Sequence, residues 1–346
     1  MANDHARPTI EDVATMAGVS DTTVSFVLSG SKHASRISPD TRDRVLAAAK
    51  SLGYSRNLIG TALQRGYSDN VVLLTVTWHL GMTHSATALA LSRAAATMGL
   101  QLVVIVAGDD DEALATIERL SSLNPYGLVL LWDSPQMPVQ ELNSMRQAGL
   151  PVVDLLPTQE EHVPSVAANR EQGSCALTKH LIELGHRRIG FLLDTTNRFK
   201  TSNAKLAGYA RALKEIGLEL DSTLLQEVPG PDFEEGYDAF AKLYERRPDI
   251  TALMSFNDST ALGAMTVAQD LGLAVPGDIS VAGYGDYAEG RHSRPKLTTV
   301  AFPAMHIARR AVQFIMDMRA EPDQTPSSHY ADMELIVRES TGPAKQ

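Results

Sequence analysis

The chain has 346 residues, more than one hydrophobic core usually serves, and its 44% hydrophobic and 21% charged residues are typical of an ordinary globular protein of two or three domains. A single cysteine excludes an intramolecular disulfide framework. With no apolar signal segment at the N-terminus and no 18-residue apolar run, we expect a cytoplasmic protein without a membrane span.

The net charge of −10 is unevenly distributed along the chain. Residues 1–67 hold eight basic and six acidic residues, net +2, whereas the remaining 23 basic and 35 acidic residues give −12. The basic potential therefore lies at the N-terminus, and the acidic body would repel phosphate.

The first predicted elements are two short helices with one tight turn between them. Thr9 can cap a helix whose apolar face repeats at i, i+3, i+4 and i+7: Ile10, Val13, Ala14 and Ala17. Gly18 supplies a left-handed turn residue. Ser20 caps a second helix whose inward face is Val24, Val27 and Leu28 and whose outward face is Asp21, Thr22, Ser25 and Phe26. This pattern predicts a helix-turn-helix that enters a major groove, with an ordinary αα-hairpin as the alternative.

A third helix follows, with Ser38-Pro39 as its cap and first residue and Gly53 just beyond its end. Its apolar residues are Val45, Leu46, Ala49 and Leu52. Tyr54 to Gly66 is a further short helical pattern.

The remainder alternates apolar runs with helical patterns, which predicts an α/β fold of parallel sheets covered on both faces. The predicted strands are Val71–Val76, Leu102–Ala107, Gly127–Leu131, Val152–Leu156, Ile189–Leu193, Ala252–Ser255, Ile279–Tyr284 and Thr298–Phe302. The predicted helices are Ser85–Met98, Asp111–Leu123, Val139–Ala148, Gln172–Leu184, Asn203–Ile216, Phe233–Glu245, Ser259–Leu271 and Ala304–Met318. The periodicity alone leaves open whether the eight strands form one wide sheet.

Motifs in a fixed order along the chain resemble the lac repressor (LacI/GalR) family of bacterial transcription regulators. They are Thr9–Leu28, Thr41–Val45, Leu52–Tyr54, His180–Gly190, Gly208-Tyr209, Asn257-Asp258, Ala261–Gly263, Val275-Pro276, Ile279–Tyr284 and Pro295–Val300. The resemblance implies a helix-turn-helix headpiece (1–54), a hinge helix and linker (55–68) and an effector-binding, dimerising body (69–346). The body would resemble two-lobed periplasmic binding proteins, with an N-lobe of about 69–168 and 302–330 and a C-lobe of about 169–300 and 331–341.

The resemblance also implies which headpiece residues contact double-stranded DNA. The family positions that contact phosphates match Thr23, Ser25, Ser38, Thr41, Tyr54 and Asn57. By their place on the second helix, Asp21, Thr22, Phe26 and Ser29 would read base edges. Thr9 and Ser20 are also predicted DNA-binding residues. Phe26 departs from the usual arginine and would contact a thymine methyl group rather than guanine. Asp21 either accepts from a cytosine amino group or caps its helix.

Leu63 matches the leucine that the family wedges into the minor groove at the centre of its operator. Gly60 replaces a usual alanine in the same hinge helix at a cost of about 1 kcal/mol in helix propensity. We expect this hinge to order only on DNA. Packing of Leu63 on the body is the alternative.

The resemblance places the effector between the lobes, in contact with Lys205, Phe233, Asn257 and Asp286. Trp78, just after the first predicted strand, either lines the same cleft or is a packing or surface residue. Lys205 stands where many members have an arginine, and Phe233 where an aromatic residue stacks on the ligand. Asn257 either binds the ligand or caps a helix. Gly285 replaces a sugar-binding aspartate, leaving only Asp286, and Leu156-Pro157 replaces an Asp-Arg pair. These departures predict a less hydroxylated ligand than a typical monosaccharide, or none.

No enzyme, cofactor or metal motif stands out. Gly283-x-Gly285-x-x-Ala288 imitates a dinucleotide fingerprint but lacks the acidic residue about 20 positions later, and the ten histidines are not at metal-ligand spacing. We expect a non-enzymatic, homodimeric repressor with a sugar-, nucleoside- or other metabolite-like effector. The alternatives are a regulator with a vestigial cleft that binds a protein partner, and a solute-binding transport protein. A tetramer is not expected, because the C-terminal leucine heptads of the lac repressor are missing.

Overall fold

The computed structural model of the chain describes residues 8–29, 36–54, 66–76, 82–134, 137–156, 163–194 and 201–345. The chain divides into two compact units, Met1–Ser68 and Asp69–Gln346.

In the described part of the first unit, three α-helices surround a small core. They are α1 (Ile10–Ala17), α2 (Asp21–Ser29) and α3 (Pro39–Leu52). Gly18 and Gly53 end α1 and α3 in the left-handed conformation, with φ of 66° and 65°. The buried core consists of Val13, Ala14, Ala17, Val24, Val27, Val45, Ala48 and Ala49. Leu46 differs from its neighbours because its position on α3 faces solvent, and it is 47% exposed.

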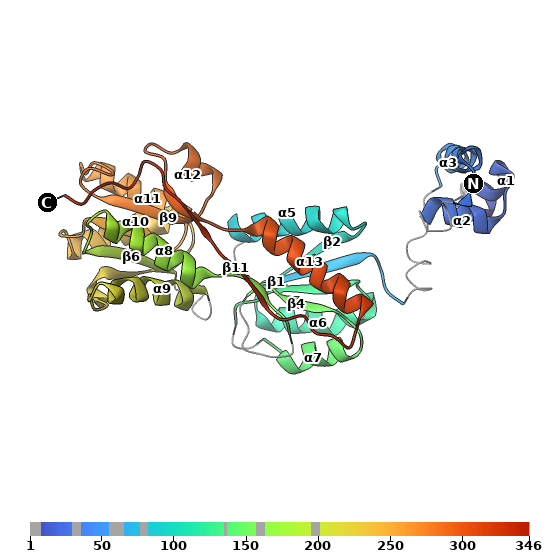
Figure 1. Cartoon of the computed structure of the whole chain (residues 1–346), viewed down its shortest axis with the longest axis horizontal. Coiled ribbons are helices and arrows are strands. Elements are labelled where there is room, and N and C mark those ends of the chain that lie inside the picture. The colour runs from blue at the N-terminus through green and yellow to red at the C-terminus, as the bar shows by residue number, and fades with distance from the viewer. Residues whose placement is uncertain are drawn as a thin grey trace, which may run out of the picture. The chain divides into compact units, whose positions relative to one another are not determined.

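The second unit contains two α/β lobes (Figure 1). In the N-terminal lobe, a parallel sheet runs in the order β2-β1-β3-β4. Its strands are β1 (Asn70–Val76), β2 (Gln101–Ala107), β3 (Gly127–Leu131) and β4 (Val152–Asp154). Its helices are α5 (Met82–Thr97), α6 (Asp110–Leu123), α7 (Val139–Gln147) and α13 (Ala304–Ala320), the last of which packs against α5.

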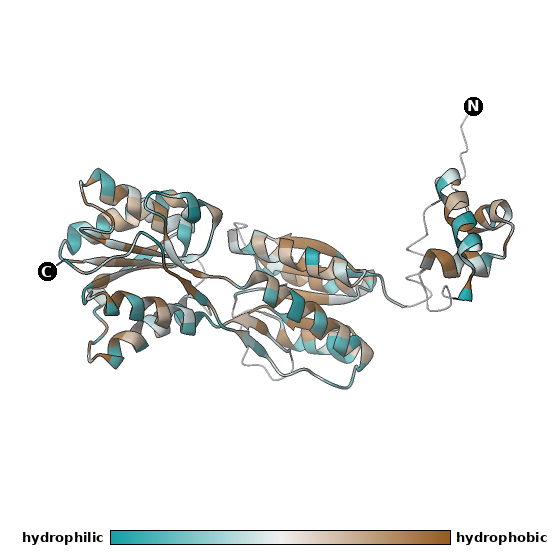
Figure 2. Cartoon of the chain, turned by 45° about the horizontal axis from the view of Figure 1, so that its top comes forward, coloured by the Kyte–Doolittle hydropathy of each residue, from teal (hydrophilic) through white to brown (hydrophobic). Residues whose placement is uncertain are grey.

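The C-terminal lobe is built on a six-stranded sheet in the order β12-β10-β9-β8-β6-β7. Its strands are β6 (Ile189–Asp194), β7 (Leu225–Val228), β8 (Ala252–Ser255), β9 (Ser280–Gly285), β10 (Thr298–Ala301) and β12 (Glu334–Ile336), of which only β12 pairs antiparallel among the described ladders of this sheet. The surrounding elements are α8 (Arg170–Glu183), α9 (Thr201–Glu215), η2 (Ser222–Leu224), α10 (Phe233–Arg246), α11 (Asp258–Asp270) and α12 (Ala288–His292). Figure 2 shows the apolar strands of this lobe as a brown layer between mixed teal and brown helices.

Close backbone approaches hold pairs of helices together in the C-terminal lobe. A Cβ on Gly208 of α9 would lie 2.2 Å from the carbonyl oxygen of Glu171 on α8. On α11, a Cβ on Gly263 would lie 2.1 Å from the carbonyl oxygen of Phe233 on α10. Glycine is therefore required at both contacts.

The chain passes between the lobes three times, after β5 (Val166–Ala168), after β10 and after β11 (His329–Ala331). β5 and β11 pair in parallel although about half the chain separates them, with Val166 opposite His329. This topology brings the carboxyl ends of strands from both lobes toward one region, which is where ligands bind in open parallel sheets.

Candidate functional site

Three of the predicted DNA-contact residues are helix N-caps in the headpiece. Thr9 and Asp12 form a reciprocal capping box, with the Thr9 N–H donating to Asp12 Oδ2 at 2.8 Å and the Asp12 N–H donating to Thr9 Oγ1 at 3.2 Å. Ser20 accepts from the Thr23 N–H at 3.3 Å, and Ser38 accepts from the Thr41 N–H at 3.2 Å. These bonds fix the starts of α1, α2 and α3.

The outward face of α2 is polar at its first turn. Asp21 and Thr22 are exposed, Ser25 and Phe26 are half-buried, and Val24 and Val27 are buried in the core. Thr23 is half-buried and bonded to Ser20. Ser29 is the last residue of α2. A capped helix that presents its first turn to solvent has the geometry of a recognition helix.

The remaining predicted DNA contacts fall in two groups. Tyr54 lies just after α3 and packs partly against the headpiece core, while Thr41 is half-buried in the first turn of α3. Asn57, Leu63 and the hinge glycine Gly60 lie outside the described residues.

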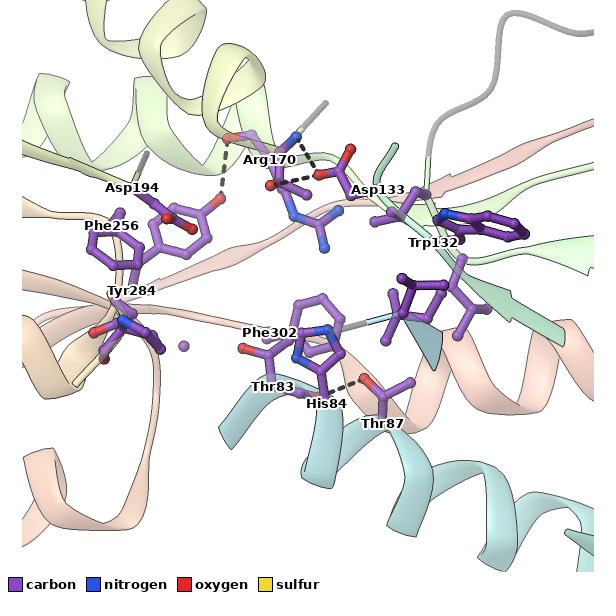
Figure 3. A pocket seen from close by; sticks show the side chains of 18 of the residues that line it. Thr83, His84, Thr87, Trp132, Asp133, Arg170, Asp194, Phe256, Tyr284 and Phe302 are labelled. Atoms are coloured by element: carbon purple, nitrogen blue, oxygen red, sulfur yellow. Dashed lines mark hydrogen bonds between the residues drawn. The ribbon is translucent and has the colours of Figure 1, made fainter. Parts of the chain in front are cut away.

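A cavity of about 600 Å³ lies between the two lobes of the second unit (Figure 3). Its wall is formed largely by residues that lie at or just after the carboxyl ends of strands: Leu131, Trp132, Asp133, Leu155, Leu156, Asp194, Phe256, Asn257, Tyr284 and Gly285. Thr83, His84 and Thr87 of α5, with Phe302 and Ile307, close the side of the N-terminal lobe. Buried aromatic rings with a few polar groups are typical of a small-molecule site.

Two cationic side chains face this cavity. Lys205 of α9 donates to the Phe256 carbonyl oxygen at 2.9 Å, and its Nζ lies 4.6 Å from the centre of the Tyr284 ring. Burial, aided by the nearby charge of Arg170, lowers the pKa of Lys205 to about 7. Arg170, the first residue of α8, is 8% exposed, and burial lowers its pKa too.

Nearby carboxylates already have hydrogen-bond donors. Asp110 accepts from Trp132 Nε1 at 2.5 Å and from Ser134 Oγ at 2.6 Å. Asp133 accepts from Oγ1 and the backbone N–H of Thr201, at 3.0 and 3.3 Å. These bonds tie strand ends to helix starts around the cavity.

Asp258, the first residue of α11, accepts hydrogen bonds from two other segments, one of which contributes Tyr287 to the cavity lining. It is fully buried and accepts from Thr299 Oγ1 and from the Tyr287 N–H, each at 2.6 Å. Burial raises its pKa to about 6 against the lowering effect of these two bonds. The Tyr287 hydroxyl in turn hydrogen-bonds Thr83 Oγ1 of the other lobe at 2.7 Å.

The predicted effector residues are not all brought together. Lys205 and Asn257 line the cavity. The Asn257 side chain caps α11 through the Thr260 N–H at 2.8 Å and donates to the Pro231 carbonyl oxygen at 2.8 Å, so its cap role is present. Phe233 begins α10, is 38% exposed and is absent from the cavity lining.

Asp286 belongs to a smaller neighbouring cavity of about 250 Å³ and is ion-paired with Arg291 at 2.6 Å and Arg338 at 2.5 Å. Trp78, with His79 and Pro157, lies outside the described residues. Sequence reasoning missed Arg170, His84 and Trp132. Only Trp132 carried a signal, since it directly follows a predicted strand.

Comparison with known proteins agrees with both units. Residues 9–57 match the family described as bacterial regulatory proteins, lacI family, and residues 178–341 match the periplasmic binding protein-like domain. The transcriptional regulator CelR of Thermobifida fusca is 31% identical over 343 residues, covering 96% of this chain and 98% of CelR. The chain belongs to the lacI family.

Other members of the lacI family show the same extent of similarity. The transcriptional repressor PurR of Haemophilus influenzae (strain PittEE) is 29% identical over 342 residues, covering 96% of this chain and 98% of PurR. The solved CelR–cellobiose complex has a TM-score of 0.72 and 29% identity, and the match covers 96% of this chain and 100% of that one. This lacI-family chain is therefore a DNA-binding transcriptional regulator with an effector cleft. No helix in the described part of the chain is long and apolar enough to cross a membrane.

Proposed function

We propose that the chain represses transcription in the cytoplasm as a homodimer on a pseudo-palindromic operator, and that a small molecule in the cavity controls this binding. The observation that carries the proposal is the capped α1–α2 pair, whose second helix exposes Asp21 and Thr22 at its first turn. A two-fold dimer of such headpieces reads two symmetric half-sites.

The proposed contacts divide by chemistry. Asp21, Thr22, Phe26 and Ser29 read base edges; Thr9, Ser20, Thr23, Ser25, Ser38, Thr41, Tyr54 and Asn57 set the register on phosphates. Leu63 of each protomer inserts at the central base step of the operator. Because two leucines, one from each protomer, bend the duplex at that step, the bend favours binding of a symmetric dimer.

An exposed apolar strip supports self-association of the body. β2 is the edge strand of its sheet, and Val103, Val104 and Val106 on it are 38%, 42% and 40% exposed. Leu89 on neighbouring α5 is 54% exposed. An uncovered edge strand that carries apolar side chains is a surface for pairing with a second copy.

The cavity supports control by a ligand rather than a vestigial cleft, because an open space of about 600 Å³ persists between the lobes. We propose Lys205 and Asn257 as effector contacts. A ligand that binds one lobe arrangement better than another shifts the spacing of the two headpieces and so changes operator affinity. No catalytic activity is proposed.

Selection from a random duplex pool by the purified full-length chain tests the proposal. The expected result is an enriched motif with two-fold symmetry and a flexible central step. Lack of enrichment, both alone and with a panel of metabolites added, would reject the DNA-binding function.

A further inference from the structure

We propose that the interlobe cavity takes an organic oxyanion, a carboxylate or a phosphate ester, whose charged group is held by Arg170 and Lys205. This inference rests on the proposed effector function of the cavity and names the chemical class of its ligand. Arg170 lies outside the family motifs of the sequence.

Arg170 is a buried cation with no hydrogen-bonded or ion-paired side-chain partner among the described residues, although the charges of Asp133 and Asp154 favour its charged form from a greater distance. Its Nη1 is fully buried and has no hydrogen-bond partner, and its side chain makes no hydrogen bond or ion pair with any residue in the described ranges. The guanidinium instead makes a cation–π contact with Phe302, whose ring centre lies 5.7 Å from Cζ. Leaving a guanidinium desolvated and unpaired is strongly unfavourable, so a ligand group is the missing partner.

The guanidinium points into the cavity, over the Phe302 ring (Figure 3). A planar guanidinium binds carboxylate and phosphate oxygens through paired N–H groups. The direction of the side chain and its fork of donors therefore both favour an oxyanion over a neutral hydroxyl group.

Lys205 is the second cation, and it is likewise without an ion pair among the described residues. The charge of Arg170 disfavours the charged form of Lys205. An anion between them would reverse this repulsion and favour the charged form of both.

The acidic residues of the cavity do not fill this role. Asp133 and Asp194 favour the charged form of Lys205 electrostatically, but neither forms an ion pair with Arg170 or Lys205. Asp110 and Asp133 accept from Trp132, Ser134 and Thr201 instead. The rings of Trp132, Phe256 and Tyr284 line the same cavity and suit an apolar or ring-shaped body of the ligand.

Binding of such a ligand should also take up a proton. The groups that face Lys205 are Arg170 of α8, Asp194 of β6, Asp133 after β3 and the rings of Phe256 and Tyr284. Because the pKa of Lys205 is about 7 in the empty cavity, an adjacent anion would raise it and draw a proton from the buffer at pH 8 or so.

The test uses the full-length chain and two generic probes, acetate and inorganic phosphate, each titrated at constant ionic strength. Thermal unfolding is followed for the wild type, Arg170→Met, Lys205→Met and the control Arg188→Met, whose exposed side chain pairs with Asp249. We expect at least one probe to stabilise the wild type and R188M, with about tenfold weaker apparent affinity in R170M. Acetate alone would indicate a carboxylate ligand, and phosphate alone a phosphate ester.

Two further readouts keep the test independent of a folding defect. Ligand-free R170M should melt at or above the wild-type temperature, because it removes an unpaired buried charge. Calorimetry with the stabilising probe at about pH 8, in two buffers of different ionisation enthalpy, should show proton uptake by the wild type that Lys205→Met abolishes.

Equal responses of wild type and R170M to both probes, or a lower melting temperature of ligand-free R170M, would overturn the inference and make Arg170 a structural residue. Neither result depends on DNA. A failed inference with a successful duplex selection would leave the regulator function standing, and the reverse outcome would leave an anion-binding protein that does not read DNA.

Discussion

At the residue scale, the burial of Asp258 makes the stability of the fold depend on pH. Its pKa in the folded chain is about 6, above the ordinary value of 3.8, so the folded state holds the proton more tightly than the unfolded state. The free energy of unfolding therefore falls as pH rises from about 4 to about 6. An asparagine keeps the shape and removes this dependence.

We predict that Asp258→Asn gains stability relative to the wild type across this pH range, by up to about 3 kcal/mol at its upper end. Urea unfolding of both proteins at several pH values measures the difference. A difference that does not change with pH would contradict the assignment of the raised pKa to Asp258.

The proposed role of Phe26 in reading a base can be tested on the operator. If its ring contacts a thymine methyl group, Phe26→Ala should weaken binding to the selected operator by about 1 kcal/mol per half-site. Replacing that thymine by deoxyuracil should weaken binding of the wild type but not of F26A, as measured by fluorescence anisotropy. Deoxyuracil outside the motif is the control. Equal losses in both proteins would show that Phe26 does not make the contact.

At the scale of elements, the α10–α11 contact is set by glycine. In an open helix Gly→Ala adds about 1 kcal/mol of stability, but at Gly263 the new Cβ would meet the Phe233 carbonyl oxygen at 2.1 Å. We predict that Gly263→Ala destabilises the body by about 1–3 kcal/mol in urea unfolding. Gly108→Ala, just before α6, is the control for adding a Cβ at a less crowded position, because its Cβ meets only the Glu112 carboxylate at 3.3 Å. A stabilised G263A would show that the helices can separate without cost.

The second prediction at this scale concerns the edge strand β2 as the proposed dimer contact. Val104→Glu places a charge in the proposed dimer contact, and we expect the dimer dissociation constant to rise by about 100-fold because that charge would be buried without a partner. Leu220→Glu is the control, since Leu220 is 43% exposed and Val104 42%. Sedimentation equilibrium measures the dimer dissociation constant of both variants. An unchanged dimer dissociation constant in V104E would show that the dimer interface does not include β2.

For the whole molecule, the alternating strands and helices of the body were predicted from the sequence, whereas four short strands were not. All eight predicted strands and eight predicted helices of the body are present, because apolar runs of four or more residues alternate with helical periods. β5, β7, β11 and β12 were missed, since no apolar run between two helical patterns marks these strands of three or four residues. The pairing of β5 with β11 depends on how the chain returns between the lobes, which no local pattern encodes.

The candidate site was predictable only where a motif or a strand end marked it. Lys205 and Asn257 were named from their motifs and line the cavity. In the sequence, Arg170 resembles an ordinary charged residue at a helix start, and its contact with Phe302 depends on how distant parts of the chain meet. Phe233 shows the converse, because its place at the first turn of α10 leaves it 38% exposed.

The measurement that tests the central claim most directly is the stoichiometry of the full-length chain on its selected duplex, by sedimentation velocity. The account predicts two chains on each duplex with both half-sites, and much weaker binding to a duplex with one. One chain per duplex, with equal affinity for one and two half-sites, would contradict a dimeric operator-binding regulator.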